Sequence, residues 1–163
     1  MSKKAKVWLQ TTDVPCMKSV GEIVSEIVQR GATQIHQEFD SNGRVIGLKF
    51  LLTLKDGNQM PVSIPARIPE MIAVLKKKIL TPRSKLWNKP VALEEMAFRI
   101  LWRQKLQWIR SMFAEIDLDQ VTPEQVFLPY FVDATGKSLG EAIVPHLQQF
   151  AAGGFAKALK GRE

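Results

Sequence analysis

The sequence predicts an α+β fold, with an N-terminal helix packed on a three- to four-stranded antiparallel meander and a helical C-terminal half. Residues 19–31 carry apolar side chains at helical spacing, residues 33–64 alternate apolar and polar side chains around two hairpin turns, and helical spacing returns after residue 67. With 163 residues, 45% of them hydrophobic, the chain is long enough to bury a sizeable core. We therefore expect a single domain over 1–163, comprising a helix and sheet (6–66), a helical half (67–150) and a frayed tail (151–163).

The first predicted elements are a short strand over Lys6–Thr12 and an amphipathic helix. Ser19 and Glu22 form a Ser-x-x-Glu capping box, which predicts that the helix begins at Ser19. Gly31 suits the left-handed residue after its C-terminus. The expected buried stripe consists of Val20, Ile23, Val24, Ile27 and Val28.

Three strands follow. Thr33–Asp40 places Ile35 and Phe39 on one face, and Asn42-Gly43 is a strong hairpin signal. Arg44–Leu54 alternates strictly, and Asp56-Gly57 predicts a second hairpin. The apolar face is expected to hold Ile46, Leu48, Phe50, Leu52, Leu54, Met60, Val62 and Ile64.

The helical half begins where Pro69 fits the first turn of a helix that ends in Lys76-Lys77-Lys78. A loop over Leu80–Pro90 leads to a long helix from about Ala92 to Ile116. Thr122-Pro123-Glu124-Gln125 opens a short helix to about Tyr130, and a turn follows at Asp133–Lys137. Ser138 and Glu141 cap a last helix, which contains Pro145 and ends at Gly153-Gly154.

The charge excess is confined to one segment. The net charge is +7, and residues 67–110 hold 11 of the 23 basic residues but only three acids. Such clustering is typical of a surface that binds a polyanion, and its alternative is a solvated helical face. The candidate nucleic-acid-binding residues are Lys76, Lys77, Lys78, Arg83, Lys85, Trp87, Lys89, Arg99, Arg103 and Arg110.

Helical periodicity places Arg99, Arg103 and Arg110 within about 40° of one another, which predicts an external basic stripe. Trp102 and Trp108 alternate with these arginines, as in a base-stacking surface, but their apolar helix favours core packing. Trp87 lies in the basic loop without an apolar partner at helical spacing, so it is the better candidate for surface contact.

No motif for catalysis or metal binding is complete. Gly136-Lys137-Ser138 lacks the first P-loop glycine, because Phe131 stands in its place. Asp40 and Lys49 resemble part of a metal-dependent nuclease site, but Gly47 occupies the position of the second acid. Asp117 and Asp119 are expected to be ordinary solvated residues. We therefore expect no cofactor and a non-catalytic protein.

Histidine and cysteine chemistry has equally little support. His36 and His146 are far apart in the sequence, with no ligand motif joining them, so a metal site is not expected. Cys16 has no flanking nucleophile signature, and a Cys-His pair assembled by the fold is left open. The single cysteine, the lack of a secretory signal and the lack of a membrane-spanning stretch point to a cytoplasmic protein with no membrane partner.

The order of several short motifs resembles a family of short phage, prophage and mobile-element proteins of unknown function. These motifs are GAT at Gly31–Thr33, FDSNG, IPA at Ile64–Ala66, WRQKLQWI and EQVFLPY. The resemblance implies a host cytoplasm and a role beside replication, recombination or counter-defence, and it carries over no catalytic residue. Two functions are favoured: an accessory protein that binds DNA or RNA, or a module that docks on an acidic protein surface to inhibit or recruit it. An enzyme, whose side chains only the fold would bring together, has the least support.

Overall fold

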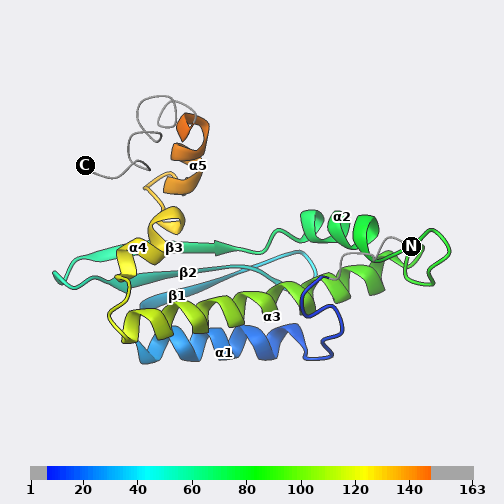
Figure 1. The fold of residues 1–163 in the computed structure, drawn as a ribbon, viewed down its shortest axis with the longest axis horizontal. Coiled ribbons are helices and arrows are strands. Elements are labelled where there is room, and N and C mark those ends of the chain that lie inside the picture. Colours follow the sequence, from blue (N-terminus) through cyan, green and yellow to red (C-terminus); the bar gives the residue numbers. More distant parts are fainter. Residues whose placement is uncertain (1–6, 148–163) are drawn as a thin grey trace, which may run out of the picture.

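The computed structural model describes residues 7–147, and it has the predicted α+β architecture. A three-stranded antiparallel sheet has the order β1–β2–β3, and two long helices lie along one of its faces (Figure 1). The strands are β1 (Thr33–Phe39), β2 (Val45–Thr53) and β3 (Gln59–Pro65). The helices are α1 (Cys16–Gln29), α2 (Ile68–Lys78), α3 (Pro90–Asp117), α4 (Pro123–Phe127) and α5 (Leu139–Ile143), with 3₁₀ turns η1 (Leu128–Tyr130) and η2 (Val144–His146).

The N-terminal predictions need two corrections. Residues 8–11 form a turn, so the strand expected at Lys6–Thr12 is wrong where the structure describes it. Helix α1 begins at Cys16, one turn before Ser19, and Pro15 takes the N-cap position. Ser19 is fully buried, so its side chain caps nothing and the predicted capping box is wrong. The helix starts early because the Pro15 carbonyl already accepts the amide hydrogens of Lys18 and Ser19.

Both hairpins form as predicted. Gly43 and Gly57 adopt φ values of +73° and +84°, the left-handed backbone that their turns require. In the first turn, the Asp40 carboxylate accepts hydrogen bonds from the amides of Asn42 and Arg44. Arg44 then pairs with Asp40 at 2.8 Å and with Glu94 of α3 at 2.9 Å, which ties this turn to the long helix.

A bulge in β2 corrects the predicted alternation. Phe39 pairs with Val45 and Glu38 with Gly47, so Ile46 is an extra residue between them. Val45 therefore enters the core and Ile46 is 37% exposed, contrary to its predicted burial. Phe39, at the edge of the same irregularity, is 53% exposed. Val28 is also exposed, so the buried stripe of α1 is narrower than expected.

The core lies between the sheet and the pair α1 and α3, which run parallel to each other (Figure 1). Trp102 of α3 is completely buried there, and its indole N–H donates to the Val45 carbonyl at 2.9 Å. Trp108 is half-buried, with its ring 5.2 Å from that of Tyr130 and 5.9 Å from that of Phe127. Both tryptophans therefore pack within the fold, as their apolar helix favoured.

The C-terminal elements lie beside the free edge of β3, where Phe131 pairs with Val62, and Phe127 of α4 packs against Phe113 and Trp108 of α3. Capping boxes at Thr122–Gln125 and Ser138–Glu141 open α4 and α5 as predicted. The helix expected to reach Tyr130 changes to 3₁₀ geometry at Leu128, and the one containing Pro145 does so at Val144. The predicted end at Gly153-Gly154 and the tail 151–163 lie outside the described residues. None of the helices within 7–147 has the length and apolar character needed to cross a bilayer.

Candidate functional site

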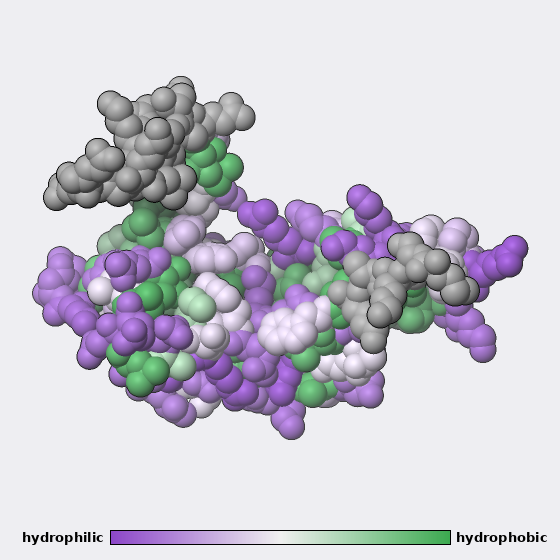
Figure 2. Space-filling view, viewed as in Figure 1, coloured by the Kyte–Doolittle hydropathy of each residue, from purple (hydrophilic) through white to green (hydrophobic). Residues whose placement is uncertain are grey.

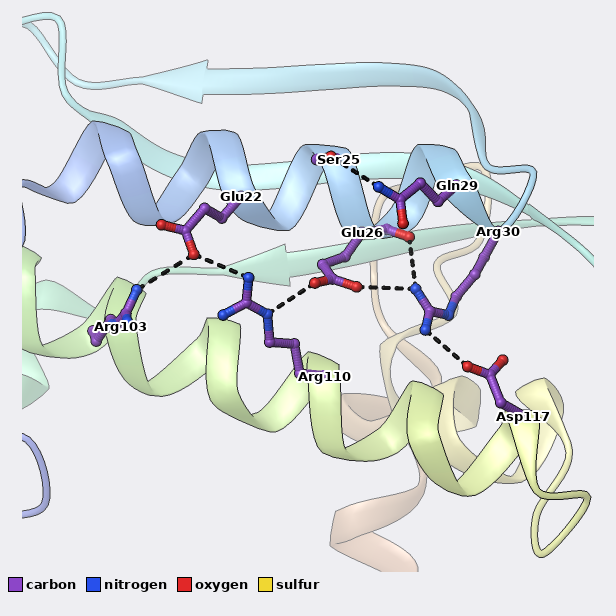
Figure 3. Close-up of polar contacts among 8 residues, drawn as sticks. All are labelled: Glu22, Ser25, Glu26, Gln29, Arg30, Arg103, Arg110 and Asp117. Atoms are coloured by element: carbon purple, nitrogen blue, oxygen red, sulfur yellow. Dashed lines mark hydrogen bonds and ion pairs between the residues drawn. The ribbon is translucent and has the colours of Figure 1, made fainter.

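The arginines of α3 face α1 and do not form the predicted external stripe (Figure 3). The guanidinium of Arg110 contacts Glu26 at 2.8 Å and Glu22 at 3.0 Å, and Arg103 contacts Glu22 at 3.5 Å. Arg99 is half-buried, and its Nε is buried without a hydrogen-bond partner among the described residues. Periodicity placed the three on one side of the helix but did not show that acids of α1 cover that side.

The same network continues to the far ends of both helices. Arg30 contacts Glu26 at 3.0 Å and Asp117 at 2.8 Å, so acids and arginines alternate along the α1–α3 seam (Figure 3). The hydrogen bond from Arg110 is the main cause that holds the pKa of Glu26 below its ordinary value. Both helices are thereby tied together, and the positive charge of Arg103 and Arg110 is locally neutralised.

The remaining basic candidates gather at one end of the molecule. We call this surface the basic end, and it consists of Lys76, Lys77, Lys78, Arg83, Lys85 and Lys89. All but Lys76 are exposed, and none of the six forms an ion pair with a carboxylate among residues 7–147. Figure 2 shows hydrophilic side chains projecting at the right-hand end, where Figure 1 places the loop after α2.

Trp87 belongs to this basic end but is only half exposed. The Lys76 ammonium lies 5.6 Å from the centre of its indole ring, within the range of a cation–π contact. The Trp87 amide donates to the Ser84 carbonyl, and the Thr81 amide donates to the Ser84 hydroxyl, so two turns shape the loop. Trp87 therefore helps to hold Lys76 in place, and part of the Trp87 side chain is exposed to solvent.

A second group of charges lies beside α3, where the end of β3, the start of α2 and the turn η1 meet it. One pocket there has a volume of about 520 Å³ and is lined by Pro65, Arg67, Met71, Leu101, Gln104, Lys105, Trp108 and Tyr130. An adjoining groove of about 660 Å³ extends from Arg67 and Tyr130 toward Glu38, Lys49 and Glu141. The surface between α2 and the α4–α5 segment is concave in Figure 2. Sequence reasoning missed this region, although Lys105 stands out as a charge four residues after buried Leu101.

The residues tested for catalysis do not assemble into a site. Asp40 pairs with Arg44, while Lys49 contacts Glu38 from the neighbouring strand. A Cβ at Gly47 would lie 2.5 Å from a carboxylate oxygen of Glu38, so the end of that side chain would have to move to admit one. Burial raises the pKa of the Cys16 thiol to about 11, so it is not a thiolate at neutral pH. Within residues 7–147, no group of three or more His, Cys, Asp or Glu side chains is placed to hold a metal ion.

Comparison of the chain with protein-family models, with curated proteins and with solved structures finds no match. The functional argument therefore depends on the geometry and charge of the chain itself.

Proposed function

We propose that the protein is a phage or mobile-element accessory protein that binds nucleic acid through the basic end, without catalysing a reaction on it. The observation that carries this proposal is the group of six cations with no carboxylate partner in the described chain, at the exposed C-terminus of α2 and in the following loop. Clustered unpaired lysines attract phosphates over several ångströms, because no internal acid cancels their field. The motif resemblance supports the mobile-element context.

The chemistry of the basic end favours phosphate contacts over base readout. Five of its six side chains are exposed, and the six are placed at the end of α2 and in the loop that leads to α3. Such contacts position a protein on nucleic acid without selecting a sequence. We therefore expect similar affinity for different sequences of the same strandedness.

Salt dependence provides the direct test. If the six cations neutralise most of their possible phosphates, the logarithm of the binding constant should fall against the logarithm of salt with a slope of about −3 to −5. Fluorescence anisotropy with labelled single-stranded DNA, duplex DNA and RNA, from about 50 to about 300 mM salt, measures this slope. Absence of binding to all three at the lowest salt concentration would contradict the proposal.

A matched pair of variants separates the basic end from general charge. The triple variant K77Q/K78Q/K85Q removes three exposed charges of the basic end, and the control K18Q/K55Q/K137Q removes three exposed charges elsewhere. K77Q/K78Q/K85Q should reduce the affinity by more than about 30-fold and should make the salt slope less negative by about 3. The control variant should change the affinity only slightly. Equal losses in both would show that net charge alone attracts the nucleic acid. An acidic protein is the alternative partner, and it is favoured if the protein retains such a partner after nuclease treatment while it binds none of the three nucleic acids.

A further inference from the structure

The pocket around Lys105 is lined by two cations, of which one has no carboxylate partner among residues 7–147 and the other has a single long contact. Lys105 projects from α3 and forms no ion pair or hydrogen bond with any residue from 7 to 147. Arg67, at the junction of β3 and α2, has only a contact of 3.9 Å with Glu141, at the limit of an ion pair. Two like charges that line one pocket repel each other, so the fold maintains an arrangement that is unfavourable without a ligand.

Burial adds to that cost. It is the main cause that lowers the pKa of Lys105 to about 8, and the positive charge of Arg67 lowers it further. A desolvated lysine without a carboxylate destabilises a fold, and such groups are concentrated at sites that bind or react with ligands. An anion placed between the two cations would remove both penalties at once.

The rest of the lining is apolar and aromatic. The rings of Trp108 and Tyr130 lie 5.2 Å apart, and Met71 and Leu101 complete the apolar wall. A volume of about 520 Å³ lies within the usual range for small-molecule sites. The pocket therefore combines a charged corner with an apolar, aromatic wall, whose two rings are inclined at 51° to each other.

We propose that this pocket binds a phosphate monoester attached to a flat aromatic body, of which a nucleotide is the biological example. Lys105 and Arg67 hold the phosphate, and Trp108 and Tyr130 contact the base. A phosphate monoester fits better than a carboxylate because its charge at pH 7 is close to −2 and matches two cations. The guanidinium of Arg67 also presents a planar fork of donors suited to phosphate oxygens.

Two sources have this chemistry: a free nucleotide, and the 5′-phosphate at the end of a nucleic-acid strand. Isothermal titration with AMP, GMP, CMP, UMP and phenyl phosphate tests the first source. Oligonucleotides with and without a 5′-phosphate test the second. We expect one-to-one binding for at least one phosphorylated probe, and at least about tenfold weaker binding of the same probe without its phosphate.

Variants assign the binding to the pocket. Lys105→Met and Arg67→Gln should each weaken binding at least about tenfold, while the control Lys85→Met should leave it unchanged. Lys105→Met should keep or raise the melting temperature, since it removes a desolvated charge, so its binding loss is not caused by unfolding. In ¹³C-labelled protein, the phosphorylated probe should raise the pKa of Lys105 above about 8.

Some results would overturn the proposal. One is that none of the five small probes and not the 5′-phosphorylated strand binds at about 10 mM. The other is that Lys105→Met leaves the binding unchanged. A gain from the terminal phosphate on a strand assigns the site to strand ends, and binding of free nucleotides alone assigns it to small ligands. The small probes do not depend on the basic end, so their failure is distinguishable from failure of nucleic-acid binding there.

Discussion

Replacement of Arg110 by methionine tests whether the α3 arginines serve the fold or a ligand. Methionine keeps an apolar stem of similar shape, so the change mainly removes the two charged contacts with Glu26 and Glu22, at 2.8 and 3.0 Å. The Arg110 side chain is 40% exposed, and those of Glu22 and Glu26 are 27% and 20% exposed. The pairs therefore lie between solvent-exposed ion pairs and buried ones.

Those exposures set the magnitude of the effect. An exposed ion pair contributes about 0.2–1 kcal/mol, and a buried hydrogen bond to a charged group contributes about 1.5–3 kcal/mol. Two contacts of intermediate exposure should together contribute about 1–2 kcal/mol, or about 2–8 °C in melting temperature for a domain of this size. Urea denaturation of R110M against the wild type measures the loss. A double-mutant cycle with Glu26→Gln should give a coupling of about 0.5–1 kcal/mol.

R110M should lower stability but should have little effect on nucleic-acid binding. Because Arg110 is occupied by α1, R110M should change nucleic-acid affinity less than about twofold, whereas K77Q/K78Q should weaken it about tenfold or more with little effect on stability. The structural interpretation is refuted if R110M has wild-type stability and loses as much affinity as the lysine pair. A stability loss with no coupling to Glu26 would show that the seam contributes through packing alone.

Three further predictions concern stability and are measured by denaturant or thermal unfolding. Trp102→Phe should cost about 2–4 kcal/mol, because it leaves the buried Val45 carbonyl without its donor and opens a cavity, and a cost below about 0.5 kcal/mol would contradict this. Gly43→Ala, at φ +73°, should destabilise by about 1 kcal/mol, whereas Gly21→Ala, mid-helix with nothing within 4 Å of the new Cβ, should stabilise by up to about 1 kcal/mol. The folded-state pKa of Glu26 lies below the ordinary glutamate value of 4.5, so its stabilisation is present above about pH 4.5 and is lost as pH falls through the lower folded value. Glu26→Gln should make the free energy of unfolding fall less steeply toward acidic pH. An unchanged fall would show that other carboxylates dominate it.

The sheet was predictable because its signals are local. Asn42-Gly43 and Asp56-Gly57 place left-handed residues at fixed points, and alternation between them follows from the strand period of two. The bulge at Ile46 is not visible in the sequence, since Val45 and Ile46 are both β-branched and either can enter the core. Pairing with β1 decides between them, and that is a tertiary effect.

The helix start shows how a correct local rule fails. Ser-x-x-Glu predicts a cap wherever it occurs, but Ser19 sits on the face of α1 that packs inward, and Glu22 contacts Arg103 and Arg110 of α3. Glu22 is thus engaged by arginines 81 and 88 positions away, while the buried Ser19 hydroxyl has no hydrogen-bond partner among the described residues. The capping boxes at Thr122 and Ser138 form on exposed segments, where the only tertiary ion pair of their described side chains is the 3.9 Å contact of Glu141 with Arg67.

The positive charges of residues 67–110 therefore have to be separated into those with a carboxylate partner and those without one before they indicate a function. A cation with a carboxylate at about 3 Å forms a dipole whose field fades within a Debye length of roughly 8–10 Å, whereas unpaired cations add their fields. Arg103 and Arg110 belong to the first class, through Glu22 and Glu26. Among the described cations of this segment without an ion pair, two groups face a possible ligand: the basic end in solvent, and Lys105, which lies beside Arg67 in a pocket, whereas Arg99 is half-buried on α3. The first suits an extended polyanion and the second a single phosphate, because solvated lysines can follow a backbone of many charges, while desolvated Lys105 beside Arg67 favours one anion at a fixed position. Substitutions at the two places should therefore be separable, with effects on salt slope from the basic end and on terminal or free phosphate recognition from the pocket.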